Sequence, residues 1–277
     1  MTSTTISILG CGWLGLPLAK KLKAQGYAVK GTTTSPEKIE TLQSMGIEAF
    51  LLYLDDAAEK KLPDGIASFF ECDVLIINIP PKVRSTSDTH HPAQIKQIVK
   101  AIKDHQIRDV IYVSATSVYP EVADEVDEQT FIDYENTGNR ALYSAEQLLM
   151  DTVPNLTILR PGGLLGYDRI PGRYYVGKSV KNGDNPVNYI HLDDAIEIIA
   201  SLLKKNLWGE TLNLVSPIHP SRKQVFLKNA SDLNFDPPTF EASGVSKPSK
   251  LVVGDKLIEL LGYNFLYPDP REFYYTL

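Results

Sequence analysis

Three glycines near the amino end have the residue type and spacing of a loop that binds the phosphates of a dinucleotide. They are Gly10, Gly12 and Gly15, in the stretch SILGCGWLGLPLA. The loop follows an apolar, β-rich run and opens a helical pattern, and this context makes the G-x-G-x-x-G motif specific. The first glycine would allow a tight turn, the second the approach of a pyrophosphate, and the third close helix packing. We expect N–H groups near Trp13 and Leu14 to face the anion, favoured by the helix dipole.

The end of the second predicted strand indicates which dinucleotide the loop would hold. An NAD site usually has an acid there, which binds the ribose 2′-hydroxyl. The stretch GTTTSPEK instead offers hydroxyl and ammonium groups that could hold a 2′-phosphate, although it lacks the arginine that would be the stronger sign. These groups belong to Thr33, Thr34, Ser35 and Lys38. We therefore expect NADP or NAD as the cofactor, and the segment favours NADP. An alternative role for Ser35 is to cap the next helix, with the following proline as its first residue.

Alternating strand and helix patterns over the first 160 residues would position this loop. Strands are predicted at 5–9, 27–33, 47–54, 73–80, 109–115 and 155–161. Helices are predicted at 14–26, 36–45, 92–105 and 137–149. Short strand–helix–strand units imply parallel strands with helical crossovers. We therefore predict a doubly wound α/β sheet, a Rossmann fold, with Ile79 and Pro80 at its fourth strand as further cofactor contacts.

After about residue 165 the alternation loosens, and a second part of the chain begins. A loop rich in Gly, Pro and Arg covers 166–188. Shorter elements follow it, namely strands at 187–191 and 211–215 and helices at 193–205, 220–232 and 255–262. We predict a dinucleotide-binding domain over 1–165 and a small C-terminal substrate-binding part over 166–277, packed on that domain and not independent.

Composition excludes several classes of partner. The chain carries 28 Lys and Arg against 34 Asp and Glu, a formal charge of −6, with no basic run. We therefore expect neither nucleic acid nor an anionic membrane as a partner. Cys11 and Cys72 are too few for a disulfide framework. Cys11 is interpreted as a small packing residue; the alternative is a thiol whose pKa is lowered by the nearby helix N-terminus. With no signal-peptide pattern and no membrane-spanning run, we expect a cytoplasmic protein that binds a small-molecule substrate; a homodimer stays open.

Six segments occur in an order that is typical of one enzyme family. They are GCGWLG, VSATSVYP, NRALYSAEQLL, ILRPGGLLG, NYIHLDDA and TLNLVSP. With them the chain resembles, over nearly its whole length, the extended short-chain dehydrogenase/reductases of the NAD-dependent epimerase/dehydratase superfamily. The later segments HPSR and LGYNFLYPDP resemble most the atypical, YeeZ-type branch. The resemblance implies a Rossmann cofactor domain, a C-terminal substrate part and a Ser/Thr, Tyr and Lys catalytic set.

The residues at the three catalytic positions differ from the set that the resemblance implies. In the family, a tyrosine and a lysine form Y-x-x-x-K on one helix. A glutamate four residues after the lysine anchors this helix. If Glu146 is this glutamate, Leu142 stands at the lysine position and Gly138 at the tyrosine position. The serine position, four residues before Tyr119, holds Ala115. Leucine, glycine and alanine cannot transfer a proton, so we predict that the catalytic set is vacated.

Other polar residues near these positions could act as substitutes. Tyr143 and Thr116 are candidates for proton transfer, and a tyrosine that only packs is the alternative for Tyr143. Arg140 is a third candidate, better suited to clamping an anion than to acting as a base, because arginine stays protonated. Ser117 and Tyr119 complete the substrate contacts expected in this part of the chain.

Three residues beyond the sixth predicted strand are candidates for binding the substrate. Arg169 and Arg173 lie where doubly wound sheets bind ligands, and two guanidinium groups suit a carboxylate or phosphate. Two solvated surface arginines are the alternative. His191 is either a structural hydrogen-bonding residue or the cleft residue that the family's His-x-x-Asp pattern implies. Asp193 is the predicted N-cap of the next helix, and we expect no metal site.

Three functions are compatible with these features. The first is an NAD(P)-dependent oxidoreductase or epimerase-like enzyme with non-standard acid–base groups, acting on an anionic, hydroxyl-bearing substrate such as a nucleotide-sugar. The second is a non-catalytic NAD(P)-binding redox sensor or partner-binding module, which the vacated set favours. The third, a β-hydroxyacid or ketopantoate-type dehydrogenase, is disfavoured because this chain returns to strands where those enzymes continue into a helical domain.

Overall fold

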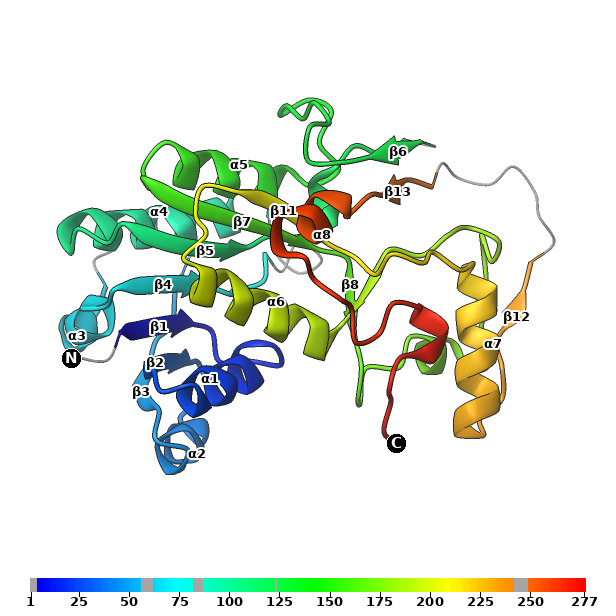
Figure 1. The fold of residues 1–277 in the computed structure, drawn as a ribbon, viewed down its shortest axis with the longest axis horizontal. Coiled ribbons are helices and arrows are strands. Elements are labelled where there is room, and N and C mark those ends of the chain that lie inside the picture. The colour runs from blue at the N-terminus through cyan, green and yellow to red at the C-terminus, as the bar shows by residue number, and fades with distance from the viewer. Residues whose placement is uncertain (1–3, 56–61, 82–86, 123, 242–248) are drawn as a thin grey trace. The chain divides into compact units, whose positions relative to one another are not determined.

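A seven-stranded sheet forms the centre of the fold (Figure 1). The computed structural model describes residues 4–55, 62–81, 87–122, 124–241 and 249–277. The strand order is β11-β7-β5-β4-β1-β2-β3, and the neighbours from β3 to β7 pair in parallel. These strands are β1 (Thr5–Leu9), β2 (Ala28–Thr33), β3 (Glu48–Leu51), β4 (Val74–Ile77), β5 (Asp109–Val113), β7 (Asn155–Pro161) and β11 (Thr211–Leu214). Because β1 has β2 on one side and β4 on the other, the strand order reverses there.

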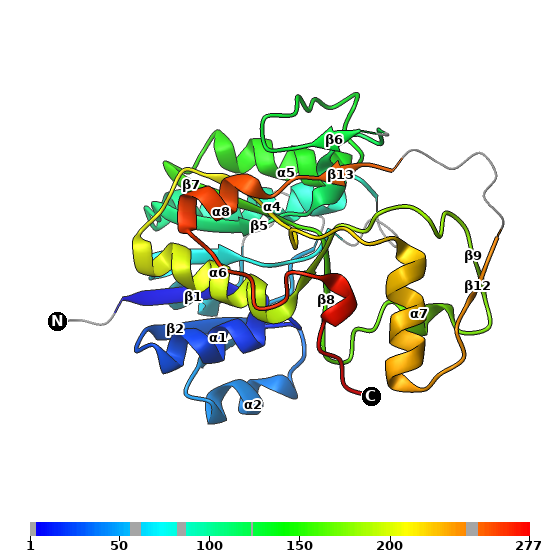
Figure 2. The ribbon, with the colours of Figure 1, turned by 45° about the vertical axis from the view of Figure 1, so that its right-hand side comes forward.

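Helices cover both faces of this sheet (Figures 1 and 2). The helices α4 (His90–Asp104) and α5 (Arg140–Met150) pack side by side on one face, and α1 (Gly15–Ala24) lies on the other. Right-handed crossovers require this arrangement, since the chain moves in opposite directions along the sheet on the two sides of β1. The remaining α-helices are α2 (Lys38–Ser44), α3 (Ala67–Phe70), α6 (Leu192–Lys205), α7 (Arg222–Leu233) and α8 (Asp255–Leu261).

The central strands β1 and β4 are largely buried, and most of their side chains are apolar. All four residues of β4, VLII, are buried, and in β1 the side chains of Ile6 and Ile8 are fully inaccessible. A parallel sheet with helices on both faces needs strands of this kind. The sheet is therefore a rigid platform, and the loops at the carboxyl ends of its strands are held in place by it.

The contacts group the chain into two compact units. The first comprises 1–118, 133–159 and 199–211, and the second comprises 119–132, 160–198 and 212–277. The second unit contains three small parallel pairs of strands, β8 with β10, β9 with β12, and β6 with β13. Their bounds are β6 (Glu125–Val126), β8 (Gly163–Leu165), β9 (Ser179–Val180), β10 (Tyr189–His191), β12 (Thr239–Phe240) and β13 (Leu251–Val252). Its α7 packs Val225 and Phe226 into a small apolar core with Val180 and Val187.

The predicted doubly wound Rossmann fold is confirmed. The strands and helices predicted before residue 162 are all present, with ends that differ by a few residues. The strand predicted at 211–215 is β11, which extends the main sheet beside β7. The sequence did not reveal α3 or five of the short strands of the second unit. The boundary predicted at residues 165 and 166 stays a prediction, because each unit collects separate stretches of chain. Among the described residues, no helix is long and apolar enough to cross a membrane.

Candidate functional site

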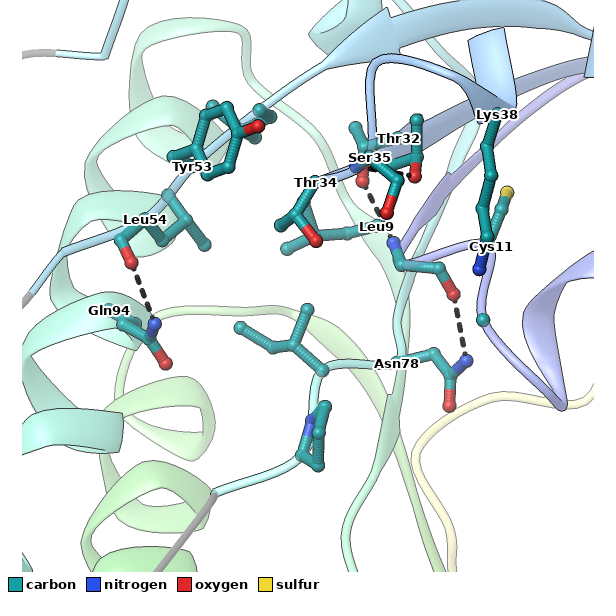
Figure 3. Close-up of a pocket in the computed structure, with 16 residues that line it drawn as sticks. Leu9, Cys11, Thr32, Thr34, Ser35, Lys38, Tyr53, Leu54, Asn78 and Gln94 are labelled. Carbon is teal, nitrogen blue, oxygen red and sulfur yellow. Dashed lines mark hydrogen bonds between the residues drawn. The ribbon is translucent and has the colours of Figure 1, made fainter. Parts of the chain in front are cut away.

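A pocket of about 470 Å³ lies at the carboxyl ends of β1, β2, β3 and β4 in the first unit (Figure 3). This is the crevice at the reversal of strand order, where doubly wound sheets bind ligands. Eight residues predicted as cofactor contacts line it, namely Gly10, Gly12, Thr33, Thr34, Ser35, Lys38, Ile79 and Pro80. In the described chain, the other three, Trp13, Leu14 and Gly15, stand outside its lining. As cofactor contacts, all of these residues stay predictions.

Two of the three loop glycines are required by the protein's own backbone. Gly10 has a φ of 103°, and a Cβ there would lie 2.5 Å from the carbonyl oxygen of Asn78. A Cβ on Gly15 would collide with the carbonyl oxygen of Gly10. Gly12 differs, because no described atom lies within 4 Å of a Cβ placed on it. The space beside Gly12 is what a closely approaching pyrophosphate needs.

Hydrogen bonds hold the loop against β2 and β4. The Gly10 N–H donates to Thr32 Oγ1 at 2.9 Å, and the side-chain amide of Asn78 donates to the Gly10 carbonyl at 3.0 Å. The Cys11 N–H donates to the Thr32 carbonyl at 2.8 Å. Within the described chain, α1 then begins at Gly15 with no side-chain cap and no acid in its first turn. A helix N-terminus of this kind suits a bound anion.

The segment after β2 presents the residues predicted to bind a 2′-phosphate. Thr34 and Ser35 point into the pocket, and Lys38 extends along its edge (Figure 3). Thr33 Oγ1 accepts a hydrogen bond from the Ser35 N–H at 3.1 Å, which fixes the turn. The predicted capping role of Ser35 is wrong, because Glu37 is the N-cap of α2 and no described side chain caps that helix. A backbone turn comes first, in which the Lys38 N–H donates to the Ser35 carbonyl at 3.0 Å.

The opposite side of the pocket was missed by the sequence reasoning. Tyr53 and Leu54 follow β3, Asn78 follows β4, and Gln94 belongs to α4. The Gln94 side-chain amide donates to the Leu54 carbonyl at 2.9 Å. These residues form no motif. The available signal was topological, because β3 pairs with β2 and the residues after both strands must therefore meet at one edge.

Cys11 is a packing residue of the glycine loop. Its side chain is 5% exposed, and burial raises the pKa of its thiol to about 12. It fills the space beside Gly31, where a Cβ would collide with the Cys11 sulfur. The thiol is therefore protonated at neutral pH, which agrees with the packing interpretation.

The start of α5 lies after the residue predicted at the tyrosine position. The helix begins at Arg140, and Asn139 is its N-cap, with a side-chain oxygen that accepts from the Leu142 N–H at 3.2 Å. Gly138 therefore precedes the helix, and Leu142 is buried in its first turn. Ala115 is half-buried after the end of β5. These three residues bring no titratable side chain to this end of the helix.

Glu146 and Ser114 connect α5 to β5. Ser114 Oγ donates to Glu146 Oε1 at 2.6 Å, and both side chains are buried. A hydrogen bond to an ionised carboxylate is stronger than one between neutral groups. Beside it, burial and the charge of Glu146 hold the pKa of Tyr112 well above its usual value. The anchoring glutamate implied by the family resemblance thus has a partner directly after the end of β5.

The substitutes predicted on α5 contact their own neighbours. The Arg140 guanidinium lies over the Tyr134 ring, 4.9 Å from its centroid, and its Nη2 is 3.6 Å from Glu135 Oε2. The Tyr143 ring packs edge-on against Tyr134, with centroids 6.5 Å apart. These contacts pair Arg140 with an acid and agree with the packing alternative for Tyr143, and the roles of both residues at the site stay predictions.

The residues that follow β5 differ in accessibility. Thr116 is half-buried and Ser117 is exposed, and both lie in the short 3₁₀ helix η2 (Thr116–Val118). Tyr119 is fully buried and donates its hydroxyl to Asn213 Oδ1 at 2.9 Å within the second unit. Of the substrate contacts predicted here, Ser117 alone is exposed, while Tyr119 is part of a core. Both roles stay predictions.

His191 is buried among aromatic rings of the second unit. Its Nδ1 accepts from the Asp193 N–H at 3.2 Å, so Nε2 carries the hydrogen and donates to the Tyr274 carbonyl at 3.2 Å. The Tyr267 ring lies 3.9 Å away, and burial lowers the pKa of the imidazole. These contacts favour the structural alternative for His191. The predicted N-cap role of Asp193 is wrong, because α6 begins at Leu192 and Asp193 lies in its first turn.

The two arginines of the predicted substrate loop are placed differently. Arg169 is half-buried, and its N–H donates to the Gly166 carbonyl at 2.9 Å in a tight turn. Arg173 is exposed in the 3₁₀ helix η3 (Gly172–Tyr175). As substrate contacts they stay predictions. In the described part of the chain, no group of three His, Cys, Asp or Glu residues could hold a metal ion.

Two solved structures resemble this fold. The UDP-glucose 4-epimerase of Thermotoga maritima with UDP-glucose superimposes with a TM-score of 0.74 and 16% identity, over 97% of this chain and 96% of that chain. The UDP-glucuronic acid 4-epimerase of Bacillus cereus in complex with NAD superimposes with a TM-score of 0.75 and 19% identity, over 98% of this chain and 97% of that chain. At such low identity these similarities establish the fold alone.

Sequence comparisons establish the family. Residues 10–205 match a family described as NAD(P)H-binding. Protein YeeZ of Escherichia coli K12 is 32% identical over 266 residues, which cover 96% of this chain and 97% of YeeZ. The matched region contains the glycine loop and every residue that lines the pocket except Leu9. The chain therefore belongs to the NAD(P)H-binding family and to the same family as YeeZ.

Proposed function

We propose that the protein binds NADP(H) in the pocket at the carboxyl ends of β1 to β4 and acts as an oxidoreductase or epimerase-like enzyme with non-standard acid–base residues. The observation that supports the cofactor site is the open space at Gly12. Packing within the protein explains Gly10 and Gly15, whereas no described atom explains a glycine at position 12. A pyrophosphate held against the backbone would explain it.

The preference for NADP over NAD rests on the segment after β2. Thr34 and Ser35 offer hydroxyl groups to the pocket, and Lys38 offers a positive charge. An ammonium group binds phosphate as a point charge, so a lysine can serve where an arginine is missing. An acid that would bind the 2′-hydroxyl of NAD and repel a 2′-phosphate does not line the described part of the pocket.

Calorimetric titration of the purified protein with NADPH and with NADH tests this assignment. We expect NADPH to bind about tenfold more tightly than NADH or better, because one extra charged contact contributes about 1.5 to 3 kcal/mol. Tighter binding of NADH would contradict the NADP preference. Failure of both to bind would overturn the cofactor site as a whole.

A Lys38→Glu variant is expected to weaken NADPH binding about 10- to 100-fold, since it replaces an attractive charge by a repulsive one near the 2′-phosphate. NADH, which lacks that phosphate, should bind within about threefold of its wild-type affinity. The same titrations measure both values. Lys103→Glu makes the same charge change at an exposed position of α4, and it is the control for the effect of the protein's net charge on binding. Equal weakening of NADPH and NADH by Lys38→Glu would contradict the assignment.

The chemistry of the site depends on where a proton can be transferred. The cofactor, when bound, supplies hydride transfer, and the protein supplies position and electrostatics. Ala115, Gly138 and Leu142 cannot transfer protons, and we infer that the family's catalytic set is vacated at these positions. Tyr143 and Thr116 are then the candidate proton carriers. An anionic, hydroxyl-bearing substrate such as a nucleotide-sugar is favoured because two enzymes with this fold are a UDP-glucose 4-epimerase and a UDP-glucuronic acid 4-epimerase.

A Tyr143→Phe variant is expected to bind NADPH with unchanged affinity, because Tyr143 stands outside the lining of the described pocket. A screen of nicotinamide fluorescence against nucleotide-sugars and small carbonyl compounds would identify a substrate. With that substrate, loss of turnover in Tyr143→Phe is the expected result. Undiminished turnover would exclude Tyr143 as the proton carrier and leave Thr116, for which Thr116→Val is the matching variant.

A non-catalytic redox sensor is the second candidate function. The absence of titratable side chains at positions 115, 138 and 142 favours it, as does the pairing of Arg140 with Glu135. A sensor should bind NADPH and NADP⁺ with clearly different affinities and give no turnover in the screen. Oxidation of NADPH by any compound in the screen, lost in Gly12→Asp, would decide for the enzyme.

A further inference from the structure

The pocket has an adenine end that the glycine loop and the segment after β2 do not form. If the pyrophosphate lies at Gly12 and the 2′-phosphate near Lys38, the ribose lies between them, and the adenine ring must extend past the end of β2. The remaining walls there are the segment after β3, with Tyr53, and the segment after β4, with Pro80. Tyr53 is 59% exposed and lines the pocket, so a large aromatic residue is available there for contact with a ligand.

The segment with Tyr53 lies outside the regular hydrogen bonding of the sheet. β3 ends at Leu51, and the last contact of this edge is the Leu52 N–H, which donates to the Thr33 carbonyl at 3.0 Å. Beyond it the chain has no regular secondary structure up to Asp55, and strand pairing no longer fixes the positions of Tyr53 and Leu54.

Two glutamines of α4 bind this segment. Gln94 Nε2 donates to the Leu54 carbonyl at 2.9 Å, and Gln97 Nε2 donates to the Asp55 carbonyl at 3.0 Å. The two residues are three positions apart on one helix, so they share a face and reach two successive carbonyls. Gln97 is 5% exposed and stands outside the lining of the described pocket, so it can act on a ligand only through the segment that it binds.

We propose that Gln94 and Gln97 form a clamp that positions Tyr53 to stack on the adenine ring, so that the affinity for the dinucleotide depends on a glutamine that does not touch it. The proposal rests on the proposed function, and it assigns Tyr53 as the adenine contact and Gln97 as a positioning residue. A flat, apolar face is what an adenine ring needs, and a base stacked on an aromatic side chain gains binding energy from the whole contact. Without the clamp, the entropy lost on ordering the segment with Tyr53 would offset part of this binding energy.

A double-mutant cycle with NADPH titration tests the clamp. Gln97→Met removes the donor and keeps the length of the side chain, and we expect about fivefold weaker binding. Tyr53→Ala removes the stacking face, and we expect about tenfold weaker binding. The double variant should bind no more weakly than Tyr53→Ala, because the clamp acts only through that ring. A mainly structural role of Gln97 would instead give two effects that multiply.

Matched variants keep the test interpretable. Gln147→Met, the same exchange on α5 outside the described pocket lining, should bind NADPH like the wild type. If Gln97→Met does not fold, Gln97→Glu keeps the shape, removes the donor when ionised, and takes its place in the cycle. Wild-type affinity in the Gln97 variant, or multiplied effects in the double variant, would overturn the clamp. Failure of the wild-type protein to bind NADPH would instead overturn the proposed function.

Discussion

A Gly12→Asp variant is expected to lose NADP(H) binding, with an affinity at least about 100-fold below that of the wild type, because like charges in contact cost several kcal/mol. The new carboxylate would occupy the space beside the loop in which the pyrophosphate is expected. That space is open in the protein, since no described atom lies within 4 Å of a Cβ at this position. The fold should therefore tolerate the change, and calorimetric titration with NADPH measures its effect on binding.

Two further variants separate charge from folding. Gly65→Asp introduces the same side chain at an exposed glycine that also has no described atom near its Cβ, and it should bind NADPH normally. Gly12→Ala adds one methyl group and should weaken binding less than the aspartate does. Wild-type affinity of a folded Gly12→Asp protein would refute the phosphate loop and leave the open space without an explanation.

The elements that the sequence predicted best are those specified by local patterns. The loop from β1 to α1 depends on glycines whose spacing reflects contacts within a few residues, such as a Cβ on Gly15 meeting the Gly10 carbonyl. The buried strand β4 is a run of four apolar residues between polar ones. Periodicity and turn residues are enough to predict such features, because the competing structures would expose apolar surface.

Features that depend on distant contacts could not be predicted in the same way. The strands β6, β9, β12 and β13 have two residues each and pair with partners far away in the sequence. Gln94 and Gln97 read as polar positions of an amphipathic helix, and their carbonyl partners become visible only when β3 is placed beside α4. The capping roles predicted for Ser35 and Asp193 failed because backbone turns and tertiary contacts shifted the helix starts.

The candidate catalytic residues show the same limit. The sequence alone revealed that positions 115, 138 and 142 lack proton-transferring side chains. It could not reveal that Arg140 is paired with Glu135, or that Ser114 is bound by Glu146. The two contacts differ in weight, because the Ser114–Glu146 hydrogen bond is buried, whereas the Arg140–Glu135 pair is exposed and costs little to break.

The stability of the protein is expected to fall between about pH 7 and pH 4 because of a buried histidine. His91 is fully buried at the start of α4, and its Nε2 lies 2.8 Å from the Tyr112 hydroxyl. Burial lowers the pKa of His91 from 6.5 to about 4. Below pH 6.5 the unfolded chain takes up a proton at this residue and the folded chain does not. The unfolded state therefore binds more protons, and the free energy of unfolding decreases as the pH falls, by about 3 kcal/mol in total.

Denaturant unfolding of the wild type and of His91→Gln at about pH 7.5 and pH 4.5 measures this contribution. The His91→Gln variant loses the hydrogen bond to Tyr112 and should be less stable at the higher pH. Between the two pH values, however, the free energy of unfolding of the variant should fall by about 2 to 3 kcal/mol less than that of the wild type, because the titrating group is gone.

His90→Gln, at the adjacent half-buried position, is the control and should show the pH dependence of the wild type. The buried His191 and the half-buried His219 also have lowered pKa values, but they act equally in all three proteins and cancel. Identical pH dependence of the wild type and His91→Gln would mean that His91 is protonated in the folded protein, which its burial beside Tyr112 opposes.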